Sequence, residues 1–162
     1  MMKINSKCRS CNRGNLIKFL DLGQHPPANS FLRIEELDKP EIKFPLEVYF
    51  CCDCNLVQLI HVVSKEHLFR NYIYFSSGMP KISLYWKSYA EDIIKNYCNG
   101  ENNNTFVLEI GSNDGILLKF FKDKGFKVLG IDPALNIAKV AESRGIPTLS
   151  DFFNVSLAEQ II

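Results

Sequence analysis

Two apolar runs in the second half of the chain, each followed by a polar turn, place the strongest constraint on its fold. Residues 107–110 lead into a turn bounded by Gly111 and Gly115, and residues 128–131 lead into Asp132. A glycine-bounded turn after one strand and a carboxylate after the next are typical of a nucleoside site at the carboxyl edge of a parallel sheet. The sequence therefore predicts a nucleoside-cofactor site at these two strand ends.

Strand-like and helix-like segments alternate around these turns. Gly125 and Gly145 are the expected helix stops, because glycine readily adopts the left-handed conformation that ends many helices. A further helix is expected to begin near Leu157. The order βαβαβ is typical of the first half of a Rossmann-like sheet. We expect strands at residues 106–110, 126–131 and 146–149, and helices at residues 115–124 and 134–144.

The spacing of the glycines favours S-adenosylmethionine over a dinucleotide. Three residues separate Gly111 from Gly115, so the Gly-x-Gly-x-x-Gly pattern that brings amides onto a pyrophosphate is absent. S-adenosylmethionine has no phosphate; it needs a close backbone approach, here at Gly111, and a carboxylate for its ribose, here Asp132. The alternative is that the turn is purely structural.

Other residues near these turns complete the predicted cofactor site. Glu109 would orient the loop or contact the cofactor ammonium through water. Asp151 would lie near the adenine amine, with the Phe152 ring against the adenine face. The candidate cofactor residues are Glu109, Gly111, Ser112, Asn113, Asp114, Gly115, Asp132, Pro133, Asp151 and Phe152.

Two Cys-x-x-Cys units in the first half predict a structural zinc site. Cys8 and Cys11 form one unit, and Cys51 and Cys54 form the other. Each unit suits a tight knuckle that directs two thiolates at one ion, and two knuckles complete a tetrahedral Zn²⁺ site with no open position. Cys52 is a spare thiol. The alternatives are ordinary free thiols or a redox pair, but no βαβ pattern accompanies these cysteines.

The rest of the first half is turn-rich. Short strands are expected at residues 16–20, 46–50 and 56–63, and the segment 23–29, with two prolines, is expected to be an ordered loop. Pro80 opens a predicted helix that continues to about Tyr97. A polar break at residues 99–104 is the best boundary candidate. We therefore divide the chain into a zinc-binding domain at residues 1–75, a connecting helix and linker at 76–104, and a partial S-adenosylmethionine-binding domain at 105–162.

Composition restricts the classes of function. The 162 residues carry a formal net charge of +1, and 46% are hydrophobic. The near-neutral charge argues against binding to nucleic acid, and no apolar run is long enough to span a membrane. The N-terminus lacks a signal-peptide core, so the cytoplasm is the expected compartment. Thiols stay reduced there, which favours metal binding over disulfides.

These motifs, in this order, resemble the S-adenosylmethionine-dependent sugar C-methyltransferases, which methylate carbon 3 of nucleotide-linked 4-keto-deoxysugars. The resemblance covers nearly the whole chain. Its motifs are Cys8-x-x-Cys11, Asp21-Leu-Gly23, Pro26-Pro27-Ala28-Asn29-Ser-Phe31-Leu32, Cys51-x-x-Cys54-Asn-Leu-Val-Gln58-Leu, Tyr72-Ile-Tyr74-Phe-Ser76-Ser77, Glu109 through Gly115, Gly130-Ile-Asp132-Pro133 and Asn136.

The resemblance implies an enzyme of deoxysugar biosynthesis with a nucleotide-linked sugar substrate. It implies an N-terminal zinc-binding domain, a central class I methyltransferase domain and a C-terminal domain. Tyr72 and Tyr74 become the candidate catalytic groups, since a Tyr hydroxyl can hydrogen-bond a keto oxygen and stabilise an enolate; the alternative is that both rings are ordinary packed aromatics. Tyr85 stands where the family usually has a histidine.

The chain is shorter than such an enzyme. The family's histidine base lies beyond the residues that match, so we expect a truncated chain that does not transfer methyl groups by itself. The alternative function is a non-catalytic zinc-binding module that docks a sugar nucleotide or a partner subunit, with the Rossmann-like half as a scaffold. The sequence carries no signal for oligomeric state.

Overall fold

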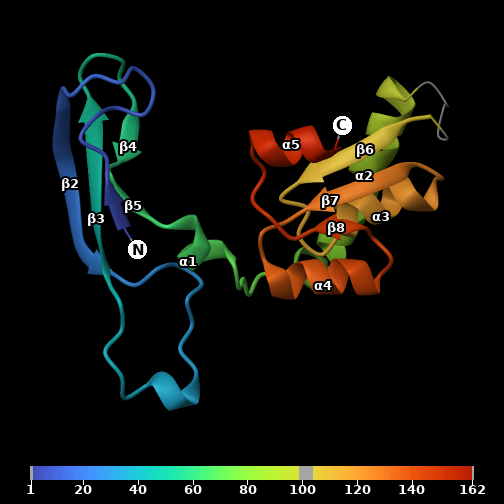
Figure 1. Cartoon of the computed structure of the whole chain (residues 1–162), viewed down its shortest axis with the longest axis horizontal. Helices are drawn as coiled ribbons and strands as arrows, with labels where there is room; N and C mark the ends of the chain where they lie inside the picture. The colour runs from blue at the N-terminus through green and yellow to red at the C-terminus, as the bar shows by residue number, and fades with distance from the viewer. Residues whose placement is uncertain (1, 99–103, 162) are drawn as a thin grey trace. The chain divides into compact units, whose positions relative to one another are not determined.

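The computed structural model of the chain describes residues 2–98 and 104–161 (Figure 1). The chain divides into two compact units, Met1–Leu68 and Phe69–Ile162. Most of the polar break predicted at residues 99–104 lies outside the described residues.

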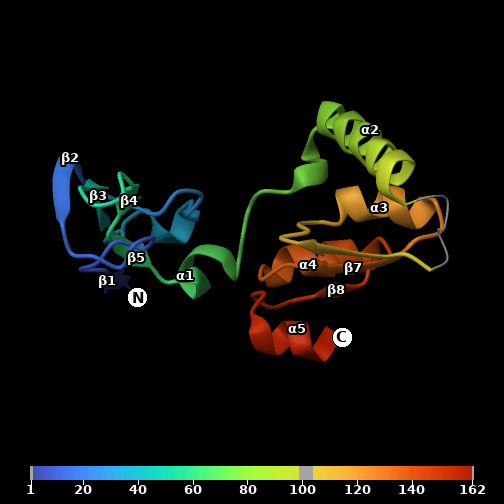
Figure 2. The ribbon, with the colours of Figure 1, turned by 90° about the horizontal axis from the view of Figure 1, so that it is seen from above.

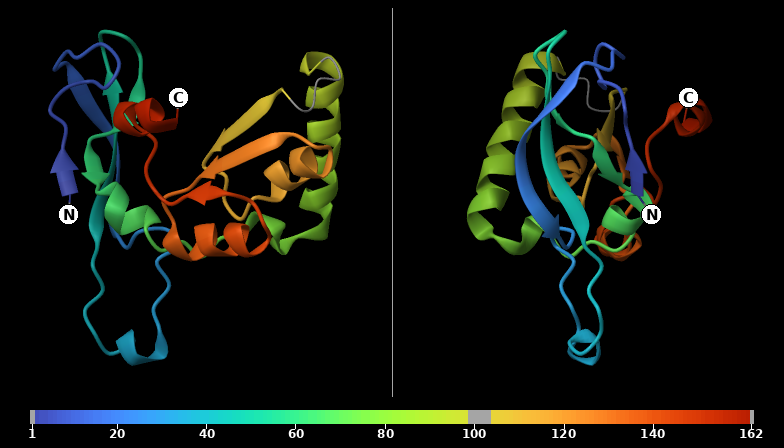
Figure 3. Two further views of the ribbon diagram at one scale, coloured as in Figure 1. Left: turned by 45° about the vertical axis from the view of Figure 1, so that its right-hand side comes forward. Right: turned by 90° about the vertical axis from the view of Figure 1, so that its left-hand side faces the viewer.

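The first unit contains two small antiparallel sheets. Strands β2 (Leu16–His25), β3 (Phe44–Cys51) and β4 (Val57–Leu59) form one, and β1 (Met2–Ile4) pairs with β5 (His61–Val63) in the other. Figure 3 shows the connection between β2 and β3 extending away from both strands, with the 3₁₀ helix η1 (Ile34–Glu36) in it. The short helix α1 (Lys65–Phe69) follows β5.

Two details of this unit differ from the prediction. Residues 23–25, expected to be loop, belong to β2: the strand passes through a bulge at Gly23, which has a positive φ of 81°, and pairs again through His25 and Phe44. Residues 56–63, expected to be one strand, form β4 and β5 in different sheets. Both the length of β2 and the division of residues 56–63 depend on which strands pair in the tertiary structure.

The second unit is a parallel three-stranded sheet with helices. Strands β6 (Phe106–Ile110), β7 (Lys127–Ile131) and β8 (Thr148–Leu149) lie in that order, with β7 in the middle. Its helices are η2 (Ser76–Gly78), α2 (Pro80–Tyr97), α3 (Ile116–Asp123), α4 (Leu135–Ser143) and α5 (Val155–Ile161). Figure 2 shows α2 and α3 on one side of the sheet and α5 on the other. The predicted fold class, a small four-cysteine domain followed by a βαβαβ unit, is confirmed.

Helices α3 and α4 end in the same C-terminal motif. Gly125 and Gly145 have positive φ angles of 88° and 79°, and their amides donate to carbonyls three residues back. The next residues, Phe126 and Ile146, donate to carbonyls five residues back, at 3.2 Å and 3.0 Å, which completes a Schellman motif. Both predicted helix stops are therefore confirmed, and each leads the chain into the strand that follows.

Hydrophobic packing joins the helices to the sheet. Ala90 of α2 lies in one buried cluster with Phe121 and Phe126. The two phenyl rings pack edge to face, with their centroids 5.8 Å apart. Leu118 of α3 and Ile146 belong to a second cluster. Helix α2, which was expected to be part of a connecting segment, thus contributes to the core of the second unit.

The close approach of β7 to the turn after β6 gives a testable prediction. A Cβ added at Gly130 would clash with Ser112 Oγ and would lie 3.1 Å from Thr148 Oγ1. Because all three positions are buried, Gly130→Ala should destabilise the second unit by about 1–3 kcal/mol. Urea unfolding measures this, with Gly78→Ala as the control, since a Cβ at Gly78 meets nothing within 4 Å. Equal stability of the two variants would contradict the prediction.

Candidate functional site

The structure brings the four predicted cysteine ligands together. Their Sγ atoms all lie within 4.8 Å of one another, and the pairs Cys8–Cys54 and Cys11–Cys51 are each 3.6 Å apart. Four sulfurs bound tetrahedrally at about 2.3 Å from one ion lie about 3.8 Å from each other. The donor set and its spacing therefore fit a structural Zn²⁺ with four thiolate ligands.

The two knuckles have the same backbone geometry. In each, the first cysteine donates its amide to the carbonyl five residues on, at 2.8 Å for Cys8 and 2.9 Å for Cys51. Its own carbonyl accepts the amide of an asparagine, Asn12 or Asn55, which has a positive φ of 59° or 63°. Asparagine tolerates this left-handed conformation better than most residues. The asparagine that follows each Cys-x-x-Cys unit is thus a sequence signal for this geometry, although the prediction rested on the cysteines alone.

Neighbouring groups support the first knuckle. Gln58 of β4 is buried, and its Oε1 accepts the Arg9 amide at 3.1 Å. The backbone amide of Cys11 is the main group that lowers the pKa of the Cys8 thiol to about 6, against the opposing effect of burial. The pKa of Cys11 and that of Cys54 are raised instead, because burial and neighbouring thiols of the cluster outweigh the backbone amides of Arg13 and Leu56. Deprotonation of all four thiols would therefore depend on Zn²⁺ binding.

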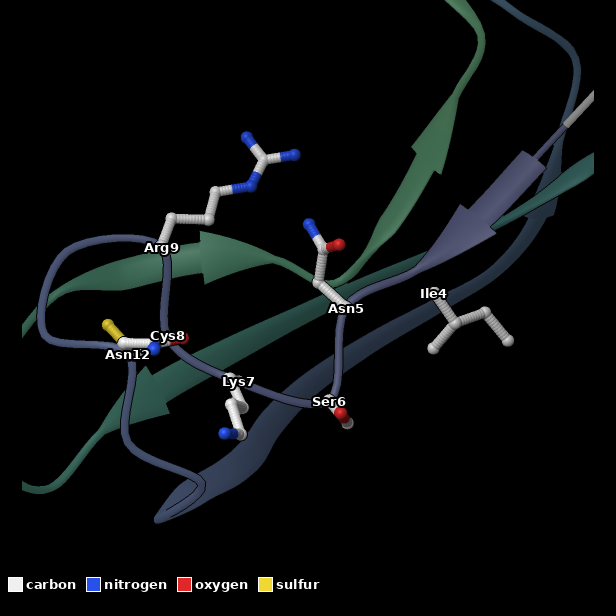
Figure 4. A pocket seen from close by; sticks show the side chains of 7 residues that line it. All are labelled: Ile4, Asn5, Ser6, Lys7, Cys8, Arg9 and Asn12. Carbon is white, nitrogen blue, oxygen red and sulfur yellow. The ribbon is translucent and has the colours of Figure 1, made fainter.

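A shallow pocket of about 370 Å³ lies beside this knuckle (Figure 4). Its lining comes from the end of β1, the segment that follows it and the first knuckle, and includes Cys8. Figure 4 shows the side chains of Lys7 and Arg9 projecting in different directions. The pocket thus presents no converging pair of cations, and the cysteine cluster remains the chemical centre of this unit.

In the second unit, the turn after β6 leaves room for a ligand at the predicted cofactor loop. Gly111 has a positive φ of 74°, and a Cβ built there would meet nothing within 4 Å. Its amide donates to the Ile131 carbonyl at 2.7 Å, which ties the turn to the end of β7. The space in front of Gly111 is therefore open.

Two carboxylates of the predicted site lie at the same edge of the sheet. Asp132 is 7% exposed, and its two oxygens accept the amides of Asn113 and Ala134, each at 2.9 Å. Glu109 is half-buried at the end of β6, and its Oε2 has no hydrogen-bond partner among the described residues. Each Asp132 oxygen has a second lone pair that can accept a further donor, and the unsatisfied Glu109 Oε2 is itself buried.

The titration of Glu109 gives a prediction. Burial, with a smaller repulsion from Asp132, raises the pKa of Glu109 from 4.5 to about 7. Between these values the folded state binds a proton that the unfolded chain has released, so stability falls as pH rises through this window. The fall should reach at most about 3 kcal/mol. Urea unfolding at about pH 5 and about pH 8 measures it.

Glu109→Gln should remove most of this pH dependence, because glutamine does not titrate. Glu142→Gln, at an exposed position of α4, serves as the matched control and should retain it. If the two variants show the same pH dependence, the burial of Glu109 does not control its titration.

The other predicted loop residues do not all face the open space. Ser112 is buried and lies against Gly130. Gly115, with a φ of 75°, caps α3 and packs against Ile146. Asp114 is fully buried; its carboxylate accepts hydrogen bonds from Ser77 and forms an ion pair with Arg144 at 3.0 Å. These contacts therefore hold the loop in place, and the backbone amides of Ser112, Asp114 and Gly115 are also bonded within the protein.

Three more predicted cofactor residues lie near the ends of β7 and β8. Pro133 is partly buried between Asp132 and the N-terminus of α4. Asp151 pairs with Arg70 at 3.7 Å, and the Arg70 guanidinium lies 4.8 Å from the centre of the Phe152 ring. Arg70 was not among the predicted residues, because its partners are about 80 residues away along the chain.

The candidate catalytic tyrosines lie in the irregular segment before η2. Tyr74 is exposed, whereas Tyr72 is partly buried and its ring lies 6.0 Å from that of Phe69. The amide and carbonyl of Tyr72 both bond to the side chain of Asn136, near the start of α4. The structure thus places this segment beside the predicted cofactor loops.

Comparison with known proteins agrees with both parts of the site. A family described as a zinc binding domain matches residues 8–69, which include all four clustered cysteines. Over 155 residues the chain is 32% identical to the C-methyltransferase NovU of Streptomyces niveus. The chain is thus similar to this C-methyltransferase along almost its whole length. The expected resemblance to the C-methyltransferases and the expected four-cysteine cluster in the N-terminal region are therefore confirmed.

The match covers a large share of this chain but a small share of the relative's sequence. It includes 96% of this chain but 36% of the relative's length, so the chain spans about a third of the relative that it matches. Within residues 2–98 and 104–161, no helix is long and apolar enough to cross a membrane.

Proposed function

We propose that the chain is the N-terminal part of an S-adenosylmethionine-dependent C-methyltransferase that acts on a nucleotide-linked 4-keto-deoxysugar. One observation carries the proposal: an open glycine turn and two carboxylates with acceptor capacity meet at the carboxyl edge of a parallel sheet, in a chain 32% identical to a C-methyltransferase.

The residues present fit S-adenosylmethionine. Gly111 would let the amino-acid portion approach the backbone, and Glu109 would accept from its ammonium group. Asp132 would accept from the ribose hydroxyls, and the Asp151–Phe152 turn would border the adenine. When bound, the cofactor supplies an electrophilic methyl group on its sulfonium. The protein's part is to hold this group in line with the acceptor carbon.

Tyr72 and Tyr74 are the residues that we propose to contact the substrate. Removing a proton beside a ketone places negative charge on the keto oxygen, and a Tyr hydroxyl donating to that oxygen stabilises the charge. Tyr74 is exposed and Tyr72 lies two residues away, in a segment bonded to the cofactor loops. We assign this role to the pair; the zinc cluster, with four thiolates and no open position, stays structural.

Titration calorimetry on the zinc-loaded chain tests the proposal. We expect saturable binding of S-adenosylmethionine and none of NAD, because the loop lacks the glycines that approach a pyrophosphate. Saturation-transfer NMR with a nucleotide-linked 4-keto-deoxysugar, against the free nucleotide, then tests the substrate class. Sugar-nucleotide binding without S-adenosylmethionine binding would instead support a non-catalytic docking module.

A further inference from the structure

The segment that carries the tyrosines, residues 70–77, crosses the carboxyl edge of the sheet, and we call it the strap. At its start, the Arg70 carbonyl accepts the Leu135 amide of α4 at 3.1 Å, and the Arg70 side chain reaches the turn after β8. At its end, Ser77 bonds to Asp114 in the turn after β6. The strap therefore contacts the turn after β8, the start of α4 and the turn after β6.

Two asparagine side chains hold the middle of the strap. Asn136 Nδ2 donates to the Tyr72 carbonyl at 2.6 Å, and Asn136 Oδ1 accepts the Tyr72 amide at 3.0 Å. Asn113 Nδ2 donates to the Tyr74 carbonyl at 3.0 Å, and Asn113 Oδ1 accepts the Ser76 amide at 2.8 Å. Residues 72–75 form no helix or strand, so these side chains pair the strap's backbone as a neighbouring strand would.

Asn113 also contacts the predicted ribose carboxylate. Its backbone amide donates to Asp132 Oδ2 at 2.9 Å, while its side chain bonds to the strap on both sides of Phe75. Its φ of 48° places it in the left-handed region, which asparagine adopts more easily than most residues. One residue thus joins the tyrosine segment to the cofactor loop.

We propose that Asn113 and Asn136 are positioning residues that hold the strap across the carboxyl edge, and that Asn113 links the placement of Tyr74 to cofactor binding. This proposal rests on the proposed function for its cofactor. A cofactor that orders the loop around Asp132 also orders the Asn113 side chain, and therefore the strap. Linkage requires the reverse as well: a released strap weakens cofactor binding by the same factor.

Amide hydrogen exchange, measured by NMR on the zinc-loaded chain, tests the positioning role. Asn136→Ala should speed exchange of the Tyr72 amide about tenfold, and Asn113→Gly should do the same for Ser76. Glycine is chosen at position 113 because it tolerates the positive φ, so that only the side chain is lost. Asn71→Ala, within the strap at an exposed position, is the matched control and should change neither amide.

Unchanged exchange at Tyr72 and Ser76 in the two variants would overturn the positioning role. A large drop in the melting temperature, with faster exchange throughout the second unit, would also overturn it, because it would show a general structural role.

Calorimetry with S-adenosylmethionine tests the linkage. Asn113→Gly should weaken binding about three- to tenfold, and bound cofactor should slow Ser76 exchange in the unmodified chain but not in this variant. Asn113→Asp should not restore the affinity, because it keeps the acceptor for Ser76 but places a carboxylate oxygen, which cannot donate, against the Tyr74 carbonyl. Equal affinity in all three proteins would overturn the linkage.

The proposed function and this inference fail in different ways. If the unmodified chain binds no S-adenosylmethionine, the proposed function and the linkage both fail, whereas the exchange rates of Tyr72 and Ser76 still decide the positioning role.

Discussion

Removal of zinc is expected to unfold the first unit, Met1–Leu68, and to leave the second unit folded. Among the described residues 2–68, the buried ones are Cys8, Cys51 and Gln58, and all three lie at the cysteine cluster. The metal site is therefore the core of this unit. A structural zinc site of four thiolates contributes on the order of 10 kcal/mol to folding, whereas a domain of this size buries too little apolar surface to fold easily without it.

Cys51→Ser with Cys54→Ser should have the same effect as a chelator. Two-dimensional NMR resolves the two units: the dispersed signals of residues 2–68 should collapse, while those of the parallel sheet persist. Cys52→Ser is the matched control, because Cys52 is exposed and lies outside the cluster. A first unit that stays folded in metal-free protein would show that the cluster does not stabilise it. Metal analysis of protein purified without chelator should give one zinc per chain.

Asp132→Ala is expected to weaken S-adenosylmethionine binding by roughly tenfold to a hundredfold or more. A carboxylate that accepts two ribose hydroxyls makes charge-assisted hydrogen bonds, which are stronger than neutral ones. The variant also releases the amides of Asn113 and Ala134, which would loosen the loop. Calorimetry measures the affinity, and thermal unfolding measures the second effect separately.

Asp132→Asn tests how the negative charge of this side chain affects cofactor affinity, because it nearly preserves the side chain's shape. The amide keeps one oxygen for the loop and loses the negative charge, so its affinity should lie between those of the unmodified chain and Asp132→Ala. Asp123→Ala, at an exposed position of α3, is the control. Unchanged affinity in Asp132→Ala would remove this carboxylate from the cofactor site.

Local sequence patterns predicted most of the second unit. Strand β6 and helix α2 have the bounds expected from apolar runs and an initial proline, and the glycines after α3 and α4 end these helices as expected. These features depend on a few neighbouring residues: periodic burial sets the element, and a left-handed glycine ends it. The Cys-x-x-Cys units belong to the same class, because a knuckle is a local turn.

The directions of side chains in the turns were not predictable in this way. Asn113 and Asp114 were expected to face a cofactor, but their side chains bond to a strap that lies almost forty residues earlier in the sequence. Arg70 pairs with Asp151 across about 80 residues, and β1 finds its partner in β5 across about 60.

The sequence by itself therefore determined the elements, their order and the chemistry of the cysteine ligands, because these follow from periodicity, turn conformation and ligand type. The tertiary structure alone decided which polar groups remain available to a ligand. In an irregular turn, each donor or acceptor bonds to whatever partner the fold brings near it, and those partners are remote in the sequence. That is why Glu109 and Asp132 keep acceptor capacity at the sheet edge while the carboxylate of Asp114 is occupied by Ser77 and Arg144.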